Sequence, residues 1–467
     1  MAVGTPGRHA RTTRNGEVSF WHTQLPSTPA RPALDGDTAC DVAIIGAGLT
    51  GLWTAYYLKL ASPELDIALF EARTVGYGAS GRNGGWLSAE LVGSREKYAA
   101  AGGRGSVLAL TKAMQEAIDE VIRVADHEGI EADIRKGGNV LVARNPAQLG
   151  RLEARVRYLR EWGADYEHIA PEELGHRIAV EGAVGAVFNP HCASLHPAKL
   201  VSGLARAVEG LGVRIYENTR CTAIDARSVY TDRGTASARS VLRCLEGFTA
   251  SVKGARREWL PMNSSMIITD PLPDFASRRI GWTGGETLGD TAHSYMYAQR
   301  TVDGRIAIGG RGVPYRFGSR TDHDGRTQQK TIASLTRLLH SMFPAAAGVP
   351  VAHAWCGVLG VPRDWCATVN YDPVTGLGAA GGYVGSGLTT TNLAGRTLAD
   401  LVLQRDTPET RLPWVGRQVR RWEPEPLRWA GVQAIYALYR AADRSEHRSQ
   451  SAETSSWARL AGRISGR

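Results

Sequence analysis

The chain has 467 residues, of which 43% are hydrophobic and 22% charged, so it can bury a large core and is not disordered as a whole. Its net charge of +9 lies mostly at its ends. Residues 1–17 carry three arginines against one glutamate, and residues 411–467 carry eleven arginines against five acids. A nucleic-acid groove needs basic residues along the folded body, so no nucleic-acid partner is expected.

Cysteine usage and hydropathy limit the class of protein further. The six cysteines form no CxxC pair, which argues against a zinc or disulfide framework and favours a reducing, cytoplasmic location. The longest uncharged stretch, 42–58, is shorter and more polar than the ~20 apolar residues of a membrane helix. No apolar run follows the N-terminal arginines, so no signal peptide is expected. No metal site is assigned, because the compact trio Asp322, His323 and Asp324 is typical of a solvated loop.

In chain order, residues 1–35 are expected to form an extended arm. The segment after it alternates strand (41–46), helix (49–60) and strand (66–71), which fits one βαβ unit. Later helices are expected at 106–127, 146–163, 197–210, 325–342, 388–403, 410–422 and 426–442. Later strands are expected at 213–218, 264–270, 294–299 and 304–310.

The α/β elements occur in separate blocks, which indicates an α/β fold (α+β overall) with a discontinuous Rossmann-type nucleotide-binding domain and an inserted mixed β-sheet substrate domain. The nucleotide-binding domain is assigned to 36–100, 195–250 and 370–410, and the substrate domain to 101–194 and 251–369. C-terminal helices at 411–445 and a basic flexible tail at 446–467 complete the chain.

The first strand leads into GAGLTG (46–51), a GxGxxG sequence at a strand-to-helix turn. Gly46 permits the tight turn, Gly48 lets a pyrophosphate approach the backbone, and Gly51 lets the helix pack closely on the strand. The helix N-terminus offers amide hydrogens and partial positive charge to the phosphates. Glu71, at the end of the second strand, is placed to accept hydrogen bonds from ribose hydroxyls and to disfavour a 2′-phosphate. A tight turn without a ligand is the alternative.

Two further glycine-rich segments favour FAD over NAD. GYGASGRNGG (76–85) follows Glu71, and GGYVGSGLTTTNLAG (381–395) opens a helix far along the chain. Two such turns suit one long ligand held at both ends. The second helix could direct its N-terminus at the pyrimidine carbonyl of a flavin and stabilise the negative charge of its reduced form. A second GxGxxG match, at 376–381, lies within an expected strand and is assigned no ligand.

These stretches resemble the FAD-dependent amine and amino-acid oxidases of the D-amino-acid oxidase superfamily. SLHPAKL (194–200), DGRIAIGGRG (303–312) and WCGVLGVPRD (355–364) add to the resemblance, which covers about residues 18–445. SFW (19–21) and EPLRW (425–429) look like the gamma-glutamylputrescine oxidase-like branch, whose substrates vary.

The resemblance implies an FAD-binding domain with a mixed β-sheet substrate domain over the flavin. The backbone near Cys221 would hold the adenine. The residues expected to contact FAD are Gly46, Gly48, Leu49, Thr50, Gly51, Glu71, Ala72, Arg73, Ser80, Arg82, Asn83, Gly84, Gly85, Trp86, Leu87, Thr222, Gly385, Ser386, Gly387, Leu388 and Thr389.

The reaction implied is oxidation of a C–N bond by hydride transfer to the flavin, with reoxidation by oxygen to give hydrogen peroxide. The flavin carries the electron chemistry, so no acid–base triad is assigned. Near the substrate the candidates are Tyr297, Arg300 and Trp282. A structural ion pair is the alternative for Arg300. A core position is favoured for Trp282 and Trp355, and a structural role for His191.

The resemblance leaves three questions open. Sarcosine oxidases activate oxygen with a lysine whose place Ala307 takes here, so a dehydrogenase that passes electrons to a partner is an alternative. An NAD-binding or non-catalytic Rossmann protein is a second alternative. Cys356 is a candidate for covalent flavin attachment, although a small buried thiol is favoured. Sarcosine oxidases hold the substrate carboxylate with an arginine and a lysine. At those two places this sequence has the uncharged Ser88 and Thr389, so an extended amine is expected to be preferred over an α-amino acid.

Overall fold

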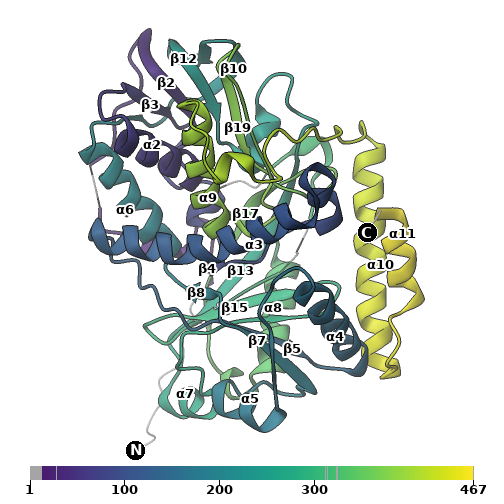
Figure 1. Cartoon of the computed structure of the whole chain (residues 1–467). Helices are drawn as coiled ribbons and strands as arrows, with labels where there is room; N and C mark the ends of the chain where they lie inside the picture. The colour runs from purple at the N-terminus through teal and green to yellow at the C-terminus, as the bar shows by residue number, and fades with distance from the viewer. Residues whose placement is uncertain (1–12, 28, 311, 313, 322–323, 466–467) are drawn as a thin grey trace, which may run out of the picture.

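The computed structural model describes residues 13–27, 29–310, 312, 314–321 and 324–465. Two large sheets with their covering helices make up this part of the chain, one in the upper and one in the lower part of Figure 1. Of the trio 322–324, the first two residues lie outside the described residues, as do residues 1–12 of the expected arm.

The upper sheet, here called the parallel sheet, has a core of parallel strands in the order β9-β3-β2-β12-β19. The β10–β11 hairpin continues it beyond β12, and β18 pairs with β19. Its strands are β2 (Thr38–Ile45), β3 (Ile67–Phe70), β9 (Arg214–Tyr216), β10 (Cys221–Asp225), β11 (Ser228–Thr231), β12 (Thr235–Arg243), β18 (Thr368–Asp372) and β19 (Leu377–Gly381). Residues 42–45 are buried because β2 is a central strand covered on both faces.

One face of the parallel sheet is covered by α2 (Leu49–Ala61), α3 (Arg95–His127), α6 (Pro197–Gly210) and α9 (Gly387–Val402), whose apolar side chains share one core. Helices α2 and α9 pack so closely that a Cβ on Gly395 would lie 2.6 Å from the Cβ of Trp53. Residues 101–127 were expected in the substrate domain, with a helix starting at 106. The helix instead starts after the N-cap Ser94 and is interrupted at Gly103 (φ 72°), and it packs into this core through Tyr98 and from Val107 onward.

The lower sheet, here called the mixed sheet, has the strand order β1-β17-β13-β16-β15-β14-β5-β7-β6 among the described residues. Its strands are β1 (Arg14–Asn15), β5 (Asn139–Ala143), β6 (Glu167–Ile169), β7 (Gly185–Asn189), β13 (Leu260–Thr269), β14 (Thr287–Asp290), β15 (Met296–Arg300), β16 (Ile306–Gly310) and β17 (Val351–Val361). Helices α5 (Pro171–Arg177), α7 (Asp274–Ile280) and α8 (Gln329–Met342) contribute to its main core, and α4 (Pro146–Arg160) packs against β5 and β7. The short strands β4 (Trp86–Ser88) and β8 (Cys192–Ser194) pair with each other.

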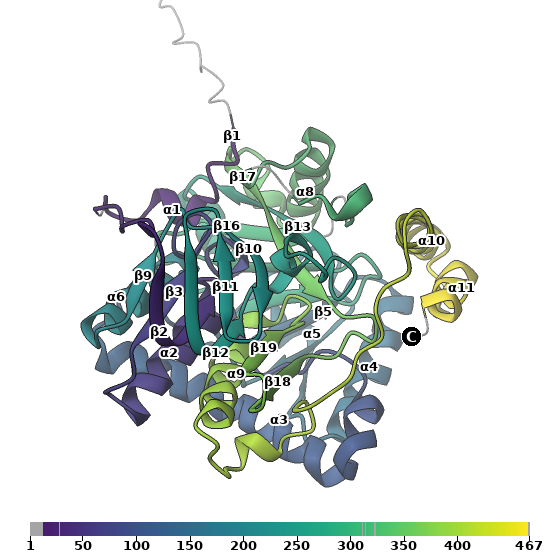
Figure 2. The same ribbon diagram turned by 90° about the horizontal axis from the view of Figure 1, so that it is seen from above.

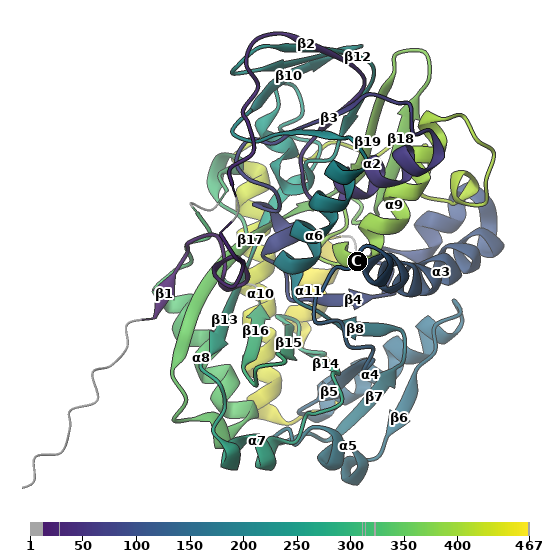
Figure 3. The same cartoon turned by 90° about the vertical axis from the view of Figure 1, so that its left-hand side faces the viewer.

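The two ends of the chain differ from the expectations for an arm and a tail. Strand β1 pairs with β17, and α1 (Phe20–Thr23) buries Phe20 and Trp21 (Figure 3). The helix expected at 410–422 is wrong: Pro413 and Gly416 interrupt it, and only a 3₁₀ turn at Glu409–Arg411 forms. The flexible tail expected at 446–467 is also wrong over its described part, because α10 (Leu427–Ser449) extends into it as far as Ser449 and α11 (Ser456–Ser465) packs on α10 (Figures 1 and 2).

Within the described part of the chain, no helix combines the length and the apolar composition that crossing a membrane requires.

Candidate active site

A cavity of about 1390 Å³ opens between the two sheets. Its size exceeds the roughly 300–1,000 Å³ of typical small-molecule pockets, so it can hold a dinucleotide together with a substrate. We call one part the cofactor half; it is lined by the β2–α2 turn, the end of β3, the loop 77–84, the segment 244–254 and the turn 383–388. The other part, the substrate half, is lined from residues 86–92, β5, α4, 289–297, Trp365 and α10.

The glycines of the β2–α2 turn each have a steric reason. Gly46 has φ +102°, and a Cβ there would lie 2.7 Å from the carbonyl oxygen of Cys244. A Cβ on Gly48 would lie 2.9 Å from Oγ of Ser80, at the cavity wall. A Cβ on Gly51 would lie 2.2 Å from the carbonyl oxygen of Gly46, so Gly51 serves helix packing and does not line the cavity.

Glu71 ties this turn to the end of β3. Its carboxylate accepts hydrogen bonds from the backbone N–H of Ala47 (3.0 Å) and of Arg73 (3.0 Å). Burial raises the pKa of Glu71, and the two backbone donors act against that rise. Glu71, Ala72 and Arg73 all line the cavity, where the sequence analysis expected the adenosine.

Two helix N-termini open into the cofactor half. Helix α2 begins after Gly48 and α9 after Ser386; neither N-cap residue caps its helix with its own side chain, and neither first turn carries an acid. In α2 the N–H of Leu49 donates to Oγ of Ser80 (2.9 Å). The hydroxyls of Thr50 and Tyr383 lie 3.2 Å apart and connect the two starts. The two positive dipole ends fit a long anionic ligand such as FAD.

The loop 78–85 is held by its own side chains. Arg82, 2% exposed, donates from Nε to the carbonyl of Tyr77 (2.6 Å) and from Nη1 to that of Cys356 (3.1 Å). Asn83 donates to the carbonyl of Ser80 (2.9 Å) and accepts from the N–H of Gly85 (2.8 Å). Arg82, Asn83 and Gly84 line the cavity as expected from the sequence, with part of the Arg82 guanidinium used on carbonyls.

The N-terminal segment holds the same loop from outside the cavity. Oγ of Ser19 donates to the carbonyl of Gly81 (2.8 Å), and Nε1 of Trp21 donates to that of Asn83 (2.9 Å). Burial first, and then Arg82, lowers the pKa of the neighbouring His22 to about 4. Sequence reasoning missed this role, although SFW at 19–21 was a visible signal.

Glu246 is a second residue that sequence reasoning missed. It lines the cavity and accepts hydrogen bonds from the backbone N–H of Tyr383 (2.7 Å) and of Gly360. It thereby joins β17 to the turn before α9. Burial raises the pKa of Glu246 to about 7. No motif marks it, because its partners come from distant segments.

Several predicted cofactor residues do not line the cavity: Gly51, Gly85, Leu87, Thr222 and Thr389. These residues are next to cavity-lining residues in the sequence but do not reach the cavity themselves. A Cβ on Gly85 would lie 2.3 Å from the carbonyl of Leu195, and Leu87 and Thr389 are fully buried. At the adenine end Cys221 lines the cavity, whereas the Thr222 hydroxyl donates to the carbonyl of Tyr230 (3.1 Å).

Of the three candidates near the substrate, only Tyr297 lines the cavity. Its hydroxyl lies 2.8 Å from Oγ of Ser264, and its ring lies against Gly84. The prediction that Arg300 lies near the substrate was wrong. Its guanidinium donates to the carbonyl of Gly281 (2.7 Å) at the end of α7. Trp282 was wrong as a substrate contact as well.

The two tryptophans and His191 have the structural positions that the sequence analysis favoured. Trp282 is fully buried and stacks on Phe343, with ring centroids 5.6 Å apart. Trp355 is also fully buried and donates to the carbonyl of Arg82 (2.8 Å). Nε2 of His191 lies 2.8 Å from a carboxylate oxygen of Asp165, outside the cavity.

Cys356 does not face the cavity. It is 1% exposed, and its sulfur lies 3.7 Å from Oδ1 of Asn263. Gly357, the next residue on β17, lines the cavity, as the alternation of side chains along a strand requires. Ala307 is likewise fully buried in a cluster with Trp355, away from the cavity.

The substrate half combines ion pairs with aromatic rings. Arg155 pairs with Glu90, and Nη1 of Arg151 lies 2.8 Å from Oε2 of Glu446. Both arginines of this half are therefore paired with carboxylates among the described residues. Burial raises the pKa of Asp290 to about 7, and this carboxyl accepts from the N–H of Met296 (3.0 Å). The rings are those of Trp86, Tyr295, Tyr297, Trp365, Tyr436 and Tyr439.

Known proteins resemble the chain over most of its length. The gamma-glutamylputrescine oxidoreductase of Escherichia coli (strain K12) is 28% identical over 381 residues, which cover 79% of this chain and 85% of the relative. The probable oxidoreductase OrdL of Rhizobium meliloti is 28% identical over 409 residues, covering 83% and 89%. The crystal structure of glycine oxidase from Geobacillus kaustophilus matches with a TM-score of 0.67 at 21% identity, over 79% of this chain and 96% of that one.

The structural likeness establishes the fold: a parallel sheet with a second, mixed sheet, as in the glycine oxidases of Bacillus cereus and Geobacillus kaustophilus. The described cofactor half fits FAD, because two helix N-termini point into it and Gly48 leaves room at its wall. The sequence matches the family described as FAD dependent oxidoreductase (DAO) over residues 41–401. The chain belongs to this family and is an FAD-dependent oxidoreductase of the amine and amino-acid oxidase type.

Proposed function

We propose that the protein oxidises the C–N bond of an extended amine whose reacting carbon bears no carboxylate, and that oxygen accepts the electrons and gives hydrogen peroxide. The observation behind the choice of substrate is the pairing of Arg151 with Glu446 and of Arg155 with Glu90 in the substrate half.

Both described arginines of this half already have a carboxylate partner, so a substrate carboxylate would meet no uncommitted guanidinium there. Burying a carboxylate without a cation costs several kcal/mol, and bidentate arginine pairing is how proteins offset that cost. To pair with a substrate, Arg155 would have to leave Glu90, and Arg151 would have to leave Glu446. The name of the Escherichia coli relative, which refers to an amine, supports the same choice, whereas glycine oxidase represents the α-amino-acid alternative.

The residues of the cofactor half divide between the two ends of FAD. The backbone of Gly48 and the N-terminus of α2 would hold the pyrophosphate, and Glu71 the ribose hydroxyls. The N–H groups of Gly46 and Leu49 already donate to the carbonyl of Phe70 and to Oγ of Ser80. The loop 82–84 and the turn 385–388 would lie beside the flavin ring. When bound, FAD accepts the hydride from the carbon next to the amine nitrogen.

The side chains around the reacting atoms orient the substrate and exclude water. The amine has to react unprotonated, because an ammonium has no lone pair to assist loss of hydride. Tyr297, whose hydroxyl pairs with Ser264, is the polar residue that extends from the mixed sheet against the loop at Gly84. We assign it a positioning role at the junction of the two halves.

A matched pair of substrates tests the proposal. Putrescine and ornithine differ only in the α-carboxylate. We expect putrescine to reduce the flavin under anaerobic conditions with a kcat/KM more than about tenfold that of ornithine. A higher kcat/KM for ornithine, with an α-keto acid as the product, would contradict the proposed substrate class.

The electron acceptor is tested in the same experiment. Admission of air to the reduced enzyme should restore the yellow absorbance within the time of one turnover and produce hydrogen peroxide. A dehydrogenase is the second candidate, because Ala307 takes the place of the lysine that sarcosine oxidases use and lies away from the cavity. Reduced enzyme that stays bleached in air but recovers with an artificial electron acceptor would identify a dehydrogenase.

A further inference from the structure

The C-terminal helix α10 forms part of the wall of the substrate half. Tyr436 and Tyr439 of α10 line the cavity. The family match ends at residue 401, so these side chains come from a segment outside the conserved family region. The buried or cavity-facing residues of α10 are Arg428, Val432, Tyr436, Tyr439, Ala442 and Glu446. Their spacing of three or four residues puts them on one face of the helix.

The N-terminal end of α10 is fixed to the body of the protein. Arg428 is 3% exposed and donates to Oε1 of Glu425 (3.1 Å) and to Oγ of Ser319 (3.1 Å). The hydroxyl of Tyr315 donates to the same carboxylate oxygen. Val432, one turn further along, is buried in a cluster with Tyr315. This end of the helix therefore has a single position against the body.

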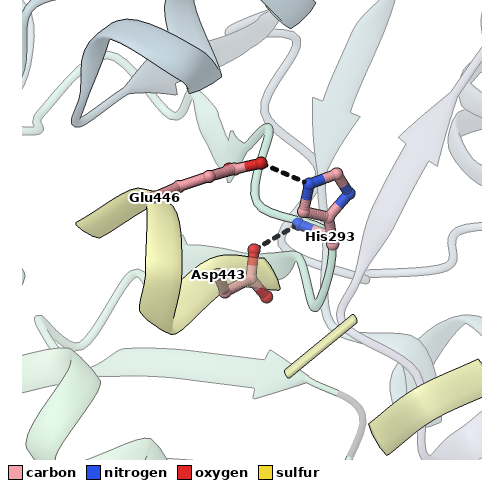
Figure 4. A group of neighbouring side chains, drawn as sticks. All are labelled: His293, Asp443 and Glu446. Carbon is pink, nitrogen blue, oxygen red and sulfur yellow. Dashed lines mark hydrogen bonds and ion pairs between the residues drawn. The ribbon is translucent and has the colours of Figure 1, made fainter. Parts of the chain in front are cut away.

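The C-terminal end is fixed by four residues that we call the helix anchor: Arg151, His293, Asp443 and Glu446. Figure 4 shows the last three of them. Nε2 of His293 lies 2.9 Å from Oε1 of Glu446, and the backbone N–H of His293 donates to Oδ1 of Asp443 (2.8 Å). Arg151 of α4 pairs with the other oxygen of Glu446 (2.8 Å). The anchor thus joins α10 to α4 and to the β14–β15 loop.

The anchor has the composition of a metal site, but its oxygens are already used. Oδ2 of Asp443 accepts from the N–H of Ser294 (2.9 Å), and Oε1 of Glu446 also accepts from that of Ser455 (2.9 Å). A divalent cation would have to displace Arg151. The helix anchor therefore serves to hold α10 in place. It also orients the ring of Tyr439, because the His293 ring stacks on that ring with centroids 5.6 Å apart and an angle of 3° between the planes.

We propose that Tyr436 and Tyr439 are specificity-determining residues that contact the part of the amine remote from the reacting C–N bond, and that the helix anchor positions them. This rests on the proposed amine oxidation. Aromatic faces suit both a methylene chain and a terminal ammonium group, through apolar contact and cation–π attraction. Only an amine long enough to extend from the flavin to α10 would reach them. The helix would thus select for length.

The kinetic test compares a short and a long amine. In the FAD-loaded enzyme, Tyr439→Ala and Tyr436→Ala should raise KM for spermidine about threefold to tenfold and leave KM for n-propylamine unchanged. Arg444→Ala, on the exposed side of α10, is the matched control and should change neither. Equal effects on both amines, or none on either, would overturn the proposal.

A second measurement needs no substrate. Acrylamide quenching of flavin fluorescence should increase about twofold in Tyr439→Ala and in Glu446→Gln, because both variants open the wall that α10 provides. Arg444→Ala should match the wild type. Unchanged quenching in both variants would show that α10 does not close the cavity. If no amine reduces the wild-type flavin while quenching increases as expected, the proposed function fails and the placement of α10 stands.

Discussion

The two halves of the cavity are built in different ways. The cofactor half uses backbone: Gly46 and Gly48 leave room, and the starts of α2 and α9 present amide hydrogens. The substrate half uses side-chain pairs that are far apart in the sequence, such as Arg155 with Glu90 and Arg151 with Glu446. Backbone geometry suits a ligand common to a whole family, and side-chain pairs can change from one member to the next.

The two chain ends add to this difference. The N-terminal segment touches the cofactor half through Ser19 and Trp21, and the C-terminal helix touches the substrate half through Tyr436 and Tyr439. Both lie outside the family match at 41–401. We therefore expect changes at the N-terminal segment to alter FAD retention and changes at α10 to alter substrate choice.

The largest effect, on FAD binding, is expected from a side chain introduced at Gly48, where the backbone forms the wall of the cofactor half. Gly48→Val should abolish FAD binding, because a Cβ already lies 2.9 Å from Oγ of Ser80 and the branched side chain would occupy the cavity. The absorbance ratio of flavin to protein after purification measures this. Gly175→Val is a control, since a Cβ at Gly175 meets nothing within 4 Å. Full flavin content in Gly48→Val would show that FAD does not lie against the backbone at Gly48.

The same contrast explains what the sequence could predict. GAGLTG and Glu71 lie within one βαβ unit, so the turn and its glycines were predictable from local pattern. Tyr297 was predictable as a residue of a strand over the flavin. Arg300, on the same strand, turns away because the carbonyls at the end of α7 offer it partners, and no local pattern reveals that. Glu246 and the helix anchor depend on segments that only the folded chain brings together.

A smaller effect is expected where the N-terminal segment holds the flavin loop. Trp21→Phe keeps an aromatic ring but removes the hydrogen bond to the carbonyl of Asn83, worth about 1 kcal/mol. If between half and all of that energy is lost from FAD binding, the Kd for FAD rises by about twofold to fivefold. Titration of the apo-protein with FAD measures it. Trp457→Phe, at an exposed tryptophan of α11, should leave Kd unchanged. An unchanged Kd in Trp21→Phe would show that the hydrogen bond from Trp21 to the loop does not contribute to FAD binding.

Two histidines at the N-terminal segment, His22 and the nearby His196, should make Tm depend on pH by a few degrees. Burial lowers the pKa of His22 and of His196 to about 4 from the ordinary 6.5. Protonation therefore favours the unfolded chain, and the stability that both histidines contribute above pH 6.5 is lost as the pH falls from 6.5 to 4. His22→Gln should make Tm less dependent on pH in this range, at about 1 °C for each 1 kcal/mol recovered in a chain of this length. A pH profile of Tm parallel to that of the wild type would contradict the assignment to His22.

The smallest effect is expected at Cys356, which tests whether the mixed sheet reaches the cofactor covalently. Its sulfur lies on the face of β17 opposite Gly357, 1% exposed and near Oδ1 of Asn263, so a bond to the flavin would require the strand to turn over. We expect acid precipitation of the wild type to leave the yellow colour in the supernatant, and Cys356→Ala to behave identically. A yellow pellet in the wild type that becomes colourless in Cys356→Ala would show a covalent bond. The backbone of the cofactor half would then not be sufficient to retain the flavin.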